Sequence, residues 1–504
     1  MAVTGLVLAA CGPALGRTAP GSPATHAAAA SSSPTSTPIP SPAPASQNPP
    51  GLQPVACASG APAGARCSTL WVPLDYSQRG RGTIPTSVID IPATDPAGRI
   101  GPLLINPGGP GESGVQFVEE DYSLLRTLNQ RFDLVGFDPR GTTGPDAVAC
   151  ESTAGLDHYV GADPFVDGSP VREADLVATS LAFADACSLH SGWLLPYLGT
   201  VNAARDMDAL RAALGVPALT YLGFSYGTAL GAEYLSLFPG HVRAMVLDGD
   251  IDPALSFTEA SIQQGASFEA SYQEFVAQCK AETSCPLGSD PDAIISSLLT
   301  DLAAHPVAIG GQTVGRGLAL TALAAAMYDP TSWGLFYSAF SEASDGSMGG
   351  LEYLADTLVG RGPGGYDPST EANAAINCAD HAAPDSLAGY DSLARSVQAT
   401  EPHFGQDEVY SMLPCTFWPF HGPAPAALHV TAAPPVLLVG ATHDPATPYA
   451  WSQALQTQIA GSVLLTRDGY GHTSYPYSAC VRSAVDAYLE QLTMPAAGTA
   501  CPTG

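Results

Sequence analysis

The sequence is poor in charged residues and poorest in basic ones. Only 13% of its 504 residues are charged, and 18 Lys and Arg stand against 47 Asp and Glu, for a formal net charge of −29. This shortage of positive charge argues against nucleic acid or an anionic membrane as a partner. Beyond the first residues, no segment is apolar for long enough to span a bilayer. There is no Cys-x-x-Cys pattern and the histidines are scattered, so we expect no metal site.

The chain is rich in hydrophobic residues. Hydrophobic residues make up 45% of the sequence, which is enough for a large buried core. At this length the chain forms one enlarged domain or two.

The first residues resemble a bacterial lipoprotein signal. A short apolar run ends in Leu8-Ala9-Ala10-Cys11, which predicts residues 1–11 as a signal remnant and Cys11 as the lipidated residue. No Lys or Arg precedes the run, so we expect the true start to lie upstream; a plain secretory remnant is the alternative. Residues 12–54 are dominated by Pro, Ala, Ser and Thr, and they predict a disordered tether.

Ten cysteines remain when Cys11 is set aside, an even number in a chain that reads as exported. Disulfides are therefore expected rather than free thiols or metal ligands. Neighbours in the sequence favour the pairs Cys57–Cys67, Cys150–Cys187, Cys279–Cys285, Cys378–Cys415 and Cys480–Cys501. Connectivity does not follow from sequence alone, so other pairings stay open.

Residues 219–228 form the stretch around which the rest of the chain is organised. An apolar run reaches Gly223, Ser225 stands between two glycines, and a helix is predicted from there through Leu237. This is a G-x-S-x-G pattern between a strand and a helix, where a strained turn exposes the serine hydroxyl above a sheet. The five residues alone are a weak signal, because an ordinary Gly-rich turn gives the same pattern.

Strands and helices alternate before and after a long helical insertion. Extended segments at 68–74 and 84–91 predict a hairpin, and further strands are expected at 102–106, 132–137, 242–247, 435–440 and 462–466. Such alternation predicts an α/β-hydrolase fold, a mostly parallel sheet with helices on both faces. We expect the core in residues 55–253 and 431–504, with a mainly helical cap in residues 254–430.

The glycine-rich segment after the strand at 102–106 predicts an oxyanion-binding loop. Residues 106–114 read NPGGPGESG, and this density of glycine leaves backbone N–H groups free to point at a ligand. In hydrolases of this layout, one oxyanion donor comes from this loop and the other from the residue after the nucleophile. We therefore expect Gly109 and Tyr226 to be the donors; a tight turn without a catalytic task is the alternative.

Two partners for Ser225 follow in the expected order. Asp444 and His472 each come just after a predicted strand, so all three side chains should meet at the carboxyl edge of one sheet. Ser225 would be the nucleophile, His472 the general base and Asp444 the acid that orients it. Rivals for the acid are Asp468, Asp248 and Asp250, and His443 is a weaker rival for the base.

Several motifs together resemble the actinobacterial secreted tripeptidyl aminopeptidases, α/β-hydrolase serine peptidases related to the proline iminopeptidases. The resemblance covers roughly residues 55–504. It rests on segments 106–111 (NPGGPG), 138–141 (DPRG), 223–228 (GFSYGT), 247–253 (LDGDIDP), 376–380 (INCAD), 415–419 (CTFWP) and 471–473 (GHT).

The resemblance implies a serine exopeptidase that releases short peptides, typically tripeptides, from a free amino terminus. It also implies cap carboxylates that hold the substrate's α-ammonium group, for which Asp380 is the first candidate, followed by Glu259 and Glu269. Asn106 departs from the His that usually opens this loop in proline iminopeptidases, which favours the tripeptidyl branch. Glu112 stands where small residues are common, and the sequence leaves open whether it faces away or tunes specificity.

We therefore expect an exported aminopeptidase of peptides or proteins, without metal or organic cofactor. It should be a monomer that meets the membrane only through a lipid anchor on the outer face of the cytoplasmic membrane. A carboxylesterase or lipase would use the same triad under an apolar cap. A catalytically idle binding lipoprotein is the alternative outside the enzymes.

Overall fold

The computed structural model describes residues 51–165, 170–384, 386–420, 422–431 and 433–503. The predicted signal remnant, Cys11 and most of the predicted tether lie outside these residues. The last part of the predicted tether was assigned wrongly, because Gly51–Val55 forms strand β1 and pairs with β2. The Pro-rich composition of this segment gave no strand pattern, because a short edge strand depends on pairing with a neighbouring strand, here β2.

A single ten-stranded sheet carries the fold, in the order β1-β2-β3-β5-β4-β6-β7-β12-β13-β14. The four strands β1, β2, β3 and β5 pair antiparallel, and the seven strands from β5 to β14 pair parallel. Their bounds are β1 Gly51–Val55, β2 Arg66–Pro73, β3 Thr83–Ile91, β4 Gly101–Asn106, β5 Phe132–Phe137, β6 Leu219–Phe224, β7 Val242–Asp248, β12 Val436–His443, β13 Val463–Tyr470 and β14 Ala500–Cys501. The predicted α/β-hydrolase fold and the hairpin that opens it are confirmed.

Helices cover both faces of this sheet, because its central strands are apolar on both sides. Leu103 and Ile105 of β4 face one layer, which includes α1 and α17, while Leu104 faces the other, which includes α5 and α6. The helices outside the insertion are α1 Gly114–Glu120, α2 Tyr122–Leu125, α3 Thr153–Val160, α4 Pro170–Ser191, α5 Thr200–Ala213, α6 Tyr226–Leu237, α16 Tyr449–Gln458 and α17 Ala479–Gln491.

The long connection between β7 and β12 is mainly helical. It comprises α7 Phe257–Ala281, α8 Pro291–Ala304, α9 Arg316–Tyr328, α10 Trp333–Ser344, α11 Gly349–Leu358, α12 Ser369–Asp380, α13 Leu387–Val397, α14 Gly405–Tyr410 and α15 Leu413–Thr416. Two small hairpins interrupt the helices, β8 Val307–Ile309 with β9 Gln312–Val314, and β10 Arg361–Gly362 with β11 Gly365–Tyr366. Short 3-10 turns complete the described chain at Arg79–Arg81, Leu128–Gln130, Gly144–Asp146, Leu195–Tyr197, Pro239–His241 and Pro330–Ser332.

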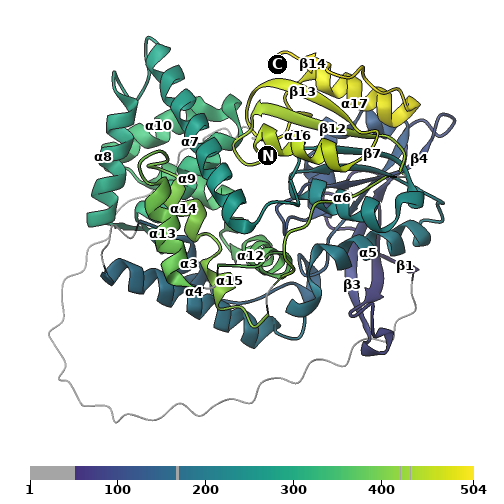
Figure 1. The fold of residues 1–504 in the computed structure, drawn as a ribbon, viewed down its shortest axis with the longest axis horizontal. Helices are drawn as coiled ribbons and strands as arrows, with labels where there is room; N and C mark the ends of the chain where they lie inside the picture. Colours follow the sequence, from purple (N-terminus) through teal and green to yellow (C-terminus); the bar gives the residue numbers. More distant parts are fainter. Residues whose placement is uncertain (1–50, 166–169, 385, 421, 432, 504) are drawn as a thin grey trace, which may run out of the picture. The chain divides into compact units, whose positions relative to one another are not determined.

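The helical layer is not made from this connection alone. Figure 1 shows α8, α9 and α10 grouped apart from β12 and β13, with α4 beside α15. Leu176 of α4 packs in one cluster with Tyr390 and Val409. Conversely, Ile376 of α12 belongs to the cluster on the sheet face. Apolar residues of the insertion therefore pack in the same clusters as residues from the rest of the chain. The predicted division into residues 55–253, 254–430 and 431–504 did not anticipate this.

Five disulfides join segments close in the sequence: Cys57–Cys67, Cys150–Cys187, Cys279–Cys285, Cys378–Cys415 and Cys480–Cys501. All five match the pairs that sequence neighbourhood favours. Within the described ranges, no helix combines the length and the apolarity of a membrane span.

Candidate active site

Ser225 lies in the sharp turn between β6 and α6. Its backbone has φ 53° and ψ −124°, a conformation that residues other than glycine rarely adopt. The turn is held by the Ser225 N–H, which donates to the Asp248 carbonyl at 2.9 Å, and by the Thr228 N–H, which donates to the Ser225 carbonyl at 2.8 Å. This geometry is that of a nucleophile elbow.

The two glycines around Ser225 are required by close backbone contacts. A Cβ at Gly223 would lie 2.5 Å from the Gly227 carbonyl oxygen, and a Cβ at Gly227 would lie 2.8 Å from the carbonyl oxygen of Asn106. No side chain fits at either position. The pattern G-x-S-x-G is thus explained by how tightly α6 approaches the end of β4.

His472 and Asp444 meet near this turn: a Cβ at Gly249, the residue after Asp248, would lie 3.4 Å from His472 Cε1. His472 Nδ1 lies 2.9 Å from Asp444 Oδ1 and 3.1 Å from Oδ2. Asp444 is buried and also accepts from the N–H groups of Thr447 at 2.8 Å and Thr473 at 2.9 Å. The carboxylate therefore orients the ring and leaves Nε2 free to exchange a proton.

Electrostatics strengthens this pair. Burial opposes the ionisation of Asp444, but the charge and hydrogen bond of His472 outweigh it and lower the pKa of Asp444. Burial likewise disfavours the imidazolium, yet Asp444 outweighs it and raises the pKa of His472. Such an arrangement stabilises the imidazolium that forms when a serine loses its proton.

The glycine-rich loop lies directly against Ser225. A Cβ at Gly108 would be 2.9 Å from the Ser225 Cβ and 3.0 Å from the Tyr226 nitrogen. Buried Asn106 braces the loop, since its Oδ1 accepts the Gly108 N–H at 3.1 Å. Among the described residues, the N–H groups of Gly109 and Tyr226 donate to no protein acceptor, as oxyanion donors require.

The other candidate acids and base have different surroundings. Asp468 stands on β13 and bonds to the Thr442 hydroxyl, and His443 stacks on Tyr470. Asp248 accepts backbone N–H groups from the loop after His472, and Asp250 is buried beside it. None of these four side chains forms a hydrogen bond with His472.

Asp380, the first candidate for binding an α-ammonium group, contacts the protein instead. Both of its oxygens accept from Thr200, through the backbone N–H and the hydroxyl. Burial raises the pKa of Asp380 to about 6. The Thr200 hydroxyl also bonds to the Tyr226 phenol, so Asp380 supports the residue that follows Ser225.

The other two candidate carboxylates are also engaged. Glu259 is exposed and completes a capping box with Ser256 at the start of α7. Glu269 is buried against His403, accepting from its Nδ1 at 3.0 Å and from its backbone N–H at 3.1 Å. Both therefore have structural partners that sequence reasoning did not foresee.

Sequence reasoning missed two carboxylates, Glu401 and Glu408. Glu401 is 6% exposed, and its Oε2 has no hydrogen-bond partner among the described residues. The Glu408 side chain is partly exposed, and its hydrogen bonds to the described residues are made by the backbone alone, to Phe404 and Ser411. Burial, together with neighbouring acids, raises the pKa of Glu401 to about 7 and that of Glu408 to about 8. No motif marks them, because their meeting at Gly265 of α7 depends on helix packing.

An aromatic wall, formed by Tyr328, Phe268 and Phe404, connects the segment of these carboxylates to His472. The Tyr328 ring packs edge-on to His472 at 5.3 Å and contacts Phe268 at 5.7 Å, and Phe268 contacts Phe404 at 5.3 Å. Phe404 lies one helical turn before Glu408, whose charge contributes to the raised pKa of Tyr328. These ring contacts link the segment that carries Glu401 and Glu408 to His472.

The inserted helices contact each of the three candidate catalytic loops. Asn373 of α12 donates to the Pro110 carbonyl in the glycine loop at 3.0 Å. The carbonyl of Tyr328, at the end of α9, accepts the His472 N–H at 2.9 Å. Gln264 of α7 donates to the Ala446 carbonyl, two residues after Asp444, at 2.6 Å.

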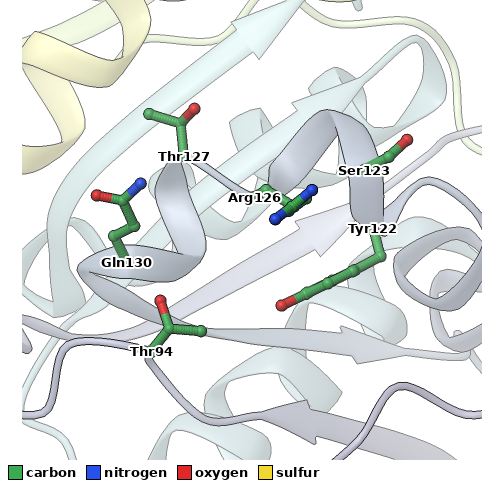
Figure 2. A pocket seen from close by; sticks show the side chains of 6 residues that line it. All are labelled: Thr94, Tyr122, Ser123, Arg126, Thr127 and Gln130. Carbon is green, nitrogen blue, oxygen red and sulfur yellow. The ribbon is translucent and has the colours of Figure 1, made fainter.

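Glu112, whose direction the sequence left open, is exposed on the glycine loop and adds to the negative charge that raises the pKa of His472. Within the described residues, no group of three His, Cys, Asp or Glu side chains is placed to hold a metal ion. A separate surface hollow near α2, lined by Thr94, Tyr122, Ser123, Arg126, Thr127 and Gln130, includes no candidate site residue (Figure 2).

Comparison with known proteins identifies the family. The family model described as TAP-like protein matches residues 401–501. Serine protease Hip1 of Mycobacterium tuberculosis (strain ATCC 25618 / H37Rv) is 37% identical over 465 residues, covering 87% of this chain and 88% of the relative. Carboxylesterase B of the same strain is 35% identical over 461 residues, covering 87% and 86%.

Tripeptidyl aminopeptidase of Streptomyces lividans is 31% identical over 441 residues, which cover 85% of this chain and 82% of that protein. The chain therefore belongs to the α/β-hydrolase family that includes serine protease Hip1, carboxylesterase B and the Streptomyces tripeptidyl aminopeptidases.

Proposed function

We propose that this protein is a serine exopeptidase that releases short peptides, tripeptides above all, from free amino termini. The observation that carries the proposal is a pair of carboxylates, Glu401 and Glu408, that form no ion pair among the described residues and lie beside the aromatic wall that ends at His472. Two relatives support it by name, a serine protease and a tripeptidyl aminopeptidase.

In this proposal, the Ser225 hydroxyl oxygen attacks the carbonyl carbon of the scissile bond while His472 takes the proton of that hydroxyl. His472 then returns the proton to the leaving amine, and water hydrolyses the acyl-enzyme with His472 again as base. Asp444 orients the imidazole and stabilises its charged form. The N–H groups of Gly109 and Tyr226 stabilise the oxyanion.

Recognition of the amino terminus falls to Glu401 and Glu408. A carboxylate in a partly desolvated site selects an ammonium group, because burial strengthens a charge-assisted hydrogen bond. Burial and neighbouring acids raise the pKa of both side chains, and a substrate ammonium group would supply the positive charge that stabilises their ionised forms. Asp380, Glu259 and Glu269 already have protein partners and are weaker candidates.

We further propose that residues 254–430 act as a cap on a core formed by residues 55–253 and 431–504. Five disulfides favour an oxidising location outside the cytoplasm. Anchoring through Cys11, with residues 12–50 as a tether, and a monomeric state remain proposals from the sequence.

A comparison of three substrates tests the function, with Ser225→Ala as the control for contaminating activity. The substrates are a free tripeptidyl anilide, the same tripeptide N-acetylated, and a short-chain p-nitrophenyl ester. We expect cleavage of the free peptide and loss of at least tenfold in kcat/KM on acetylation. Turnover of the ester alone would refute the peptidase assignment and support an esterase, the activity in the name of the relative carboxylesterase B. Failure to react with a fluorophosphonate would support a binding protein instead.

A further inference from the structure

One residue at the end of β7 bonds to two catalytic loops. The backbone carbonyl of Asp248 accepts the Ser225 N–H at 2.9 Å. Its side-chain Oδ2 accepts the N–H groups of Ser474 at 3.1 Å and Tyr475 at 2.7 Å, two and three residues beyond His472. Asp248 is fully buried, so these contacts are not shared with solvent.

Arg467 holds the same loop from β13. Its Nη2 donates to the carbonyls of Gly471 at 2.9 Å and Thr473 at 3.0 Å, and its Nε donates to the Ser474 hydroxyl at 3.2 Å. Arg467 is buried, with 2% of its surface exposed. It therefore bonds to the residues on both sides of His472.

The loop needs this support because its backbone is strained. Thr473 has φ 64°, a conformation that is unfavourable for a β-branched residue and persists only where surrounding contacts impose it. Asp444 supplies one such contact, and Asp248 and Arg467 supply the others. Asp248 interacts electrostatically with five charged or titratable side chains: Arg467, Asp250, Asp444, His472 and Tyr477.

We propose that Asp248 and Arg467 are positioning residues that clamp the His472 loop, with Asp248 setting the base relative to the nucleophile elbow. Neither side chain needs to touch the reacting atoms. The inference rests on the proposed role of His472 as general base. Because a displacement of about 1 Å in a catalytic group costs on the order of 10²-fold in rate, the clamp acts on turnover rather than on substrate binding.

The test compares Asp248→Ala with the conservative Asp248→Asn on the p-nitrophenyl ester, well below the Tm of each variant. We expect Asp248→Ala to lose about 10²-fold in kcat with KM within about twofold. Asp248→Asn, which restores an oxygen acceptor, should recover most of the loss. Asp486→Ala is the matched control: it removes the acceptor of the Tyr475 phenol, a hydrogen bond of 2.9 Å, and should lower Tm without lowering kcat.

A kcat for Asp248→Ala within threefold of wild type, with only Tm reduced, would overturn the proposal. If Asp248→Ala does not fold, Arg467→Lys takes its place: it keeps the charge but loses the forked donation, and a kcat loss of about tenfold is expected. An unchanged kcat for that variant would equally overturn the clamp.

The low-field proton resonance of the His472–Asp444 hydrogen bond separates this proposal from the proposed function. We expect Asp248→Ala to shift or broaden the signal, and an unchanged signal would refute the clamp whatever the protein hydrolyses. Wild-type protein that shows the signal but does not react with a fluorophosphonate would contradict the proposed function alone.

Discussion

Replacing Glu408 with Gln should separate amine recognition from chemistry. If Glu408 binds the substrate ammonium group, the change removes a charge-assisted hydrogen bond, a contribution of about 1.5–3 kcal/mol. The expected result is a loss of roughly 10- to 150-fold in kcat/KM on the free tripeptidyl anilide. The short-chain ester has no ammonium group, so its kcat/KM should stay within about twofold.

The same variant should be more stable than wild type at alkaline pH. Burial and neighbouring acids raise the pKa of Glu408 from 4.5 to about 8, so the folded state binds a proton that the unfolded state has released between these values. The ionised carboxylate therefore destabilises the fold as pH rises through this window, and the penalty is complete above about pH 8. Its upper limit is about 5 kcal/mol, reduced by solvent that reaches the side chain.

The assay combines kinetics on the three substrates with thermal unfolding at pH 5 and pH 9. Glu342→Gln is the matched control, because it makes the same change at an exposed site on α10. Loss of activity on the free peptide together with a higher Tm at pH 9 is expected for Glu408→Gln alone. Equal losses on peptide and ester would refute the assignment, since they would indicate damage to the triad.

Three further predictions concern the triad and the disulfides. Asp444→Asn should lower kcat by about 10⁴-fold on every substrate, because the imidazole loses the acceptor that orients it; a loss under tenfold in steady-state assays would contradict Asp444 as the acid. Turnover needs neutral His472, whose pKa Asp444 raises above 6.5, so kcat/KM on the ester should rise with pH to a midpoint above 6.5; a midpoint below 6 would contradict this electrostatic balance. Replacing Cys378 and Cys415 with Ser should lower the free energy of unfolding by about 2–4 kcal/mol, as α12 and α15 lose their link; unchanged chemical denaturation would show that packing alone joins them.

The fold was largely predictable from local pattern. The strand predicted at 132–137 is β5 residue for residue, and the helix predicted through Leu237 ends there. These segments are apolar runs bounded by glycine, proline or charge, so their length and type follow from the chain itself. Strand β1 escaped prediction because an edge strand shows no apolar pattern and depends on its partner β2.

The amino-acid sequence by itself determined most of the sheet, the strained turn at Ser225 and the order in which Asp444 and His472 follow it. Each depends on residues within a few positions of one another, or on the rule that parallel strands end at one edge. Only the tertiary structure decided which carboxylates are already paired. Asp380 meets Thr200 across 180 residues and Glu269 meets His403 across 134, whereas Glu401 and Glu408 gather without a cation. Such pairings arise from how helices pack. The sequence around a charged residue does not show whether a distant residue will pair with it.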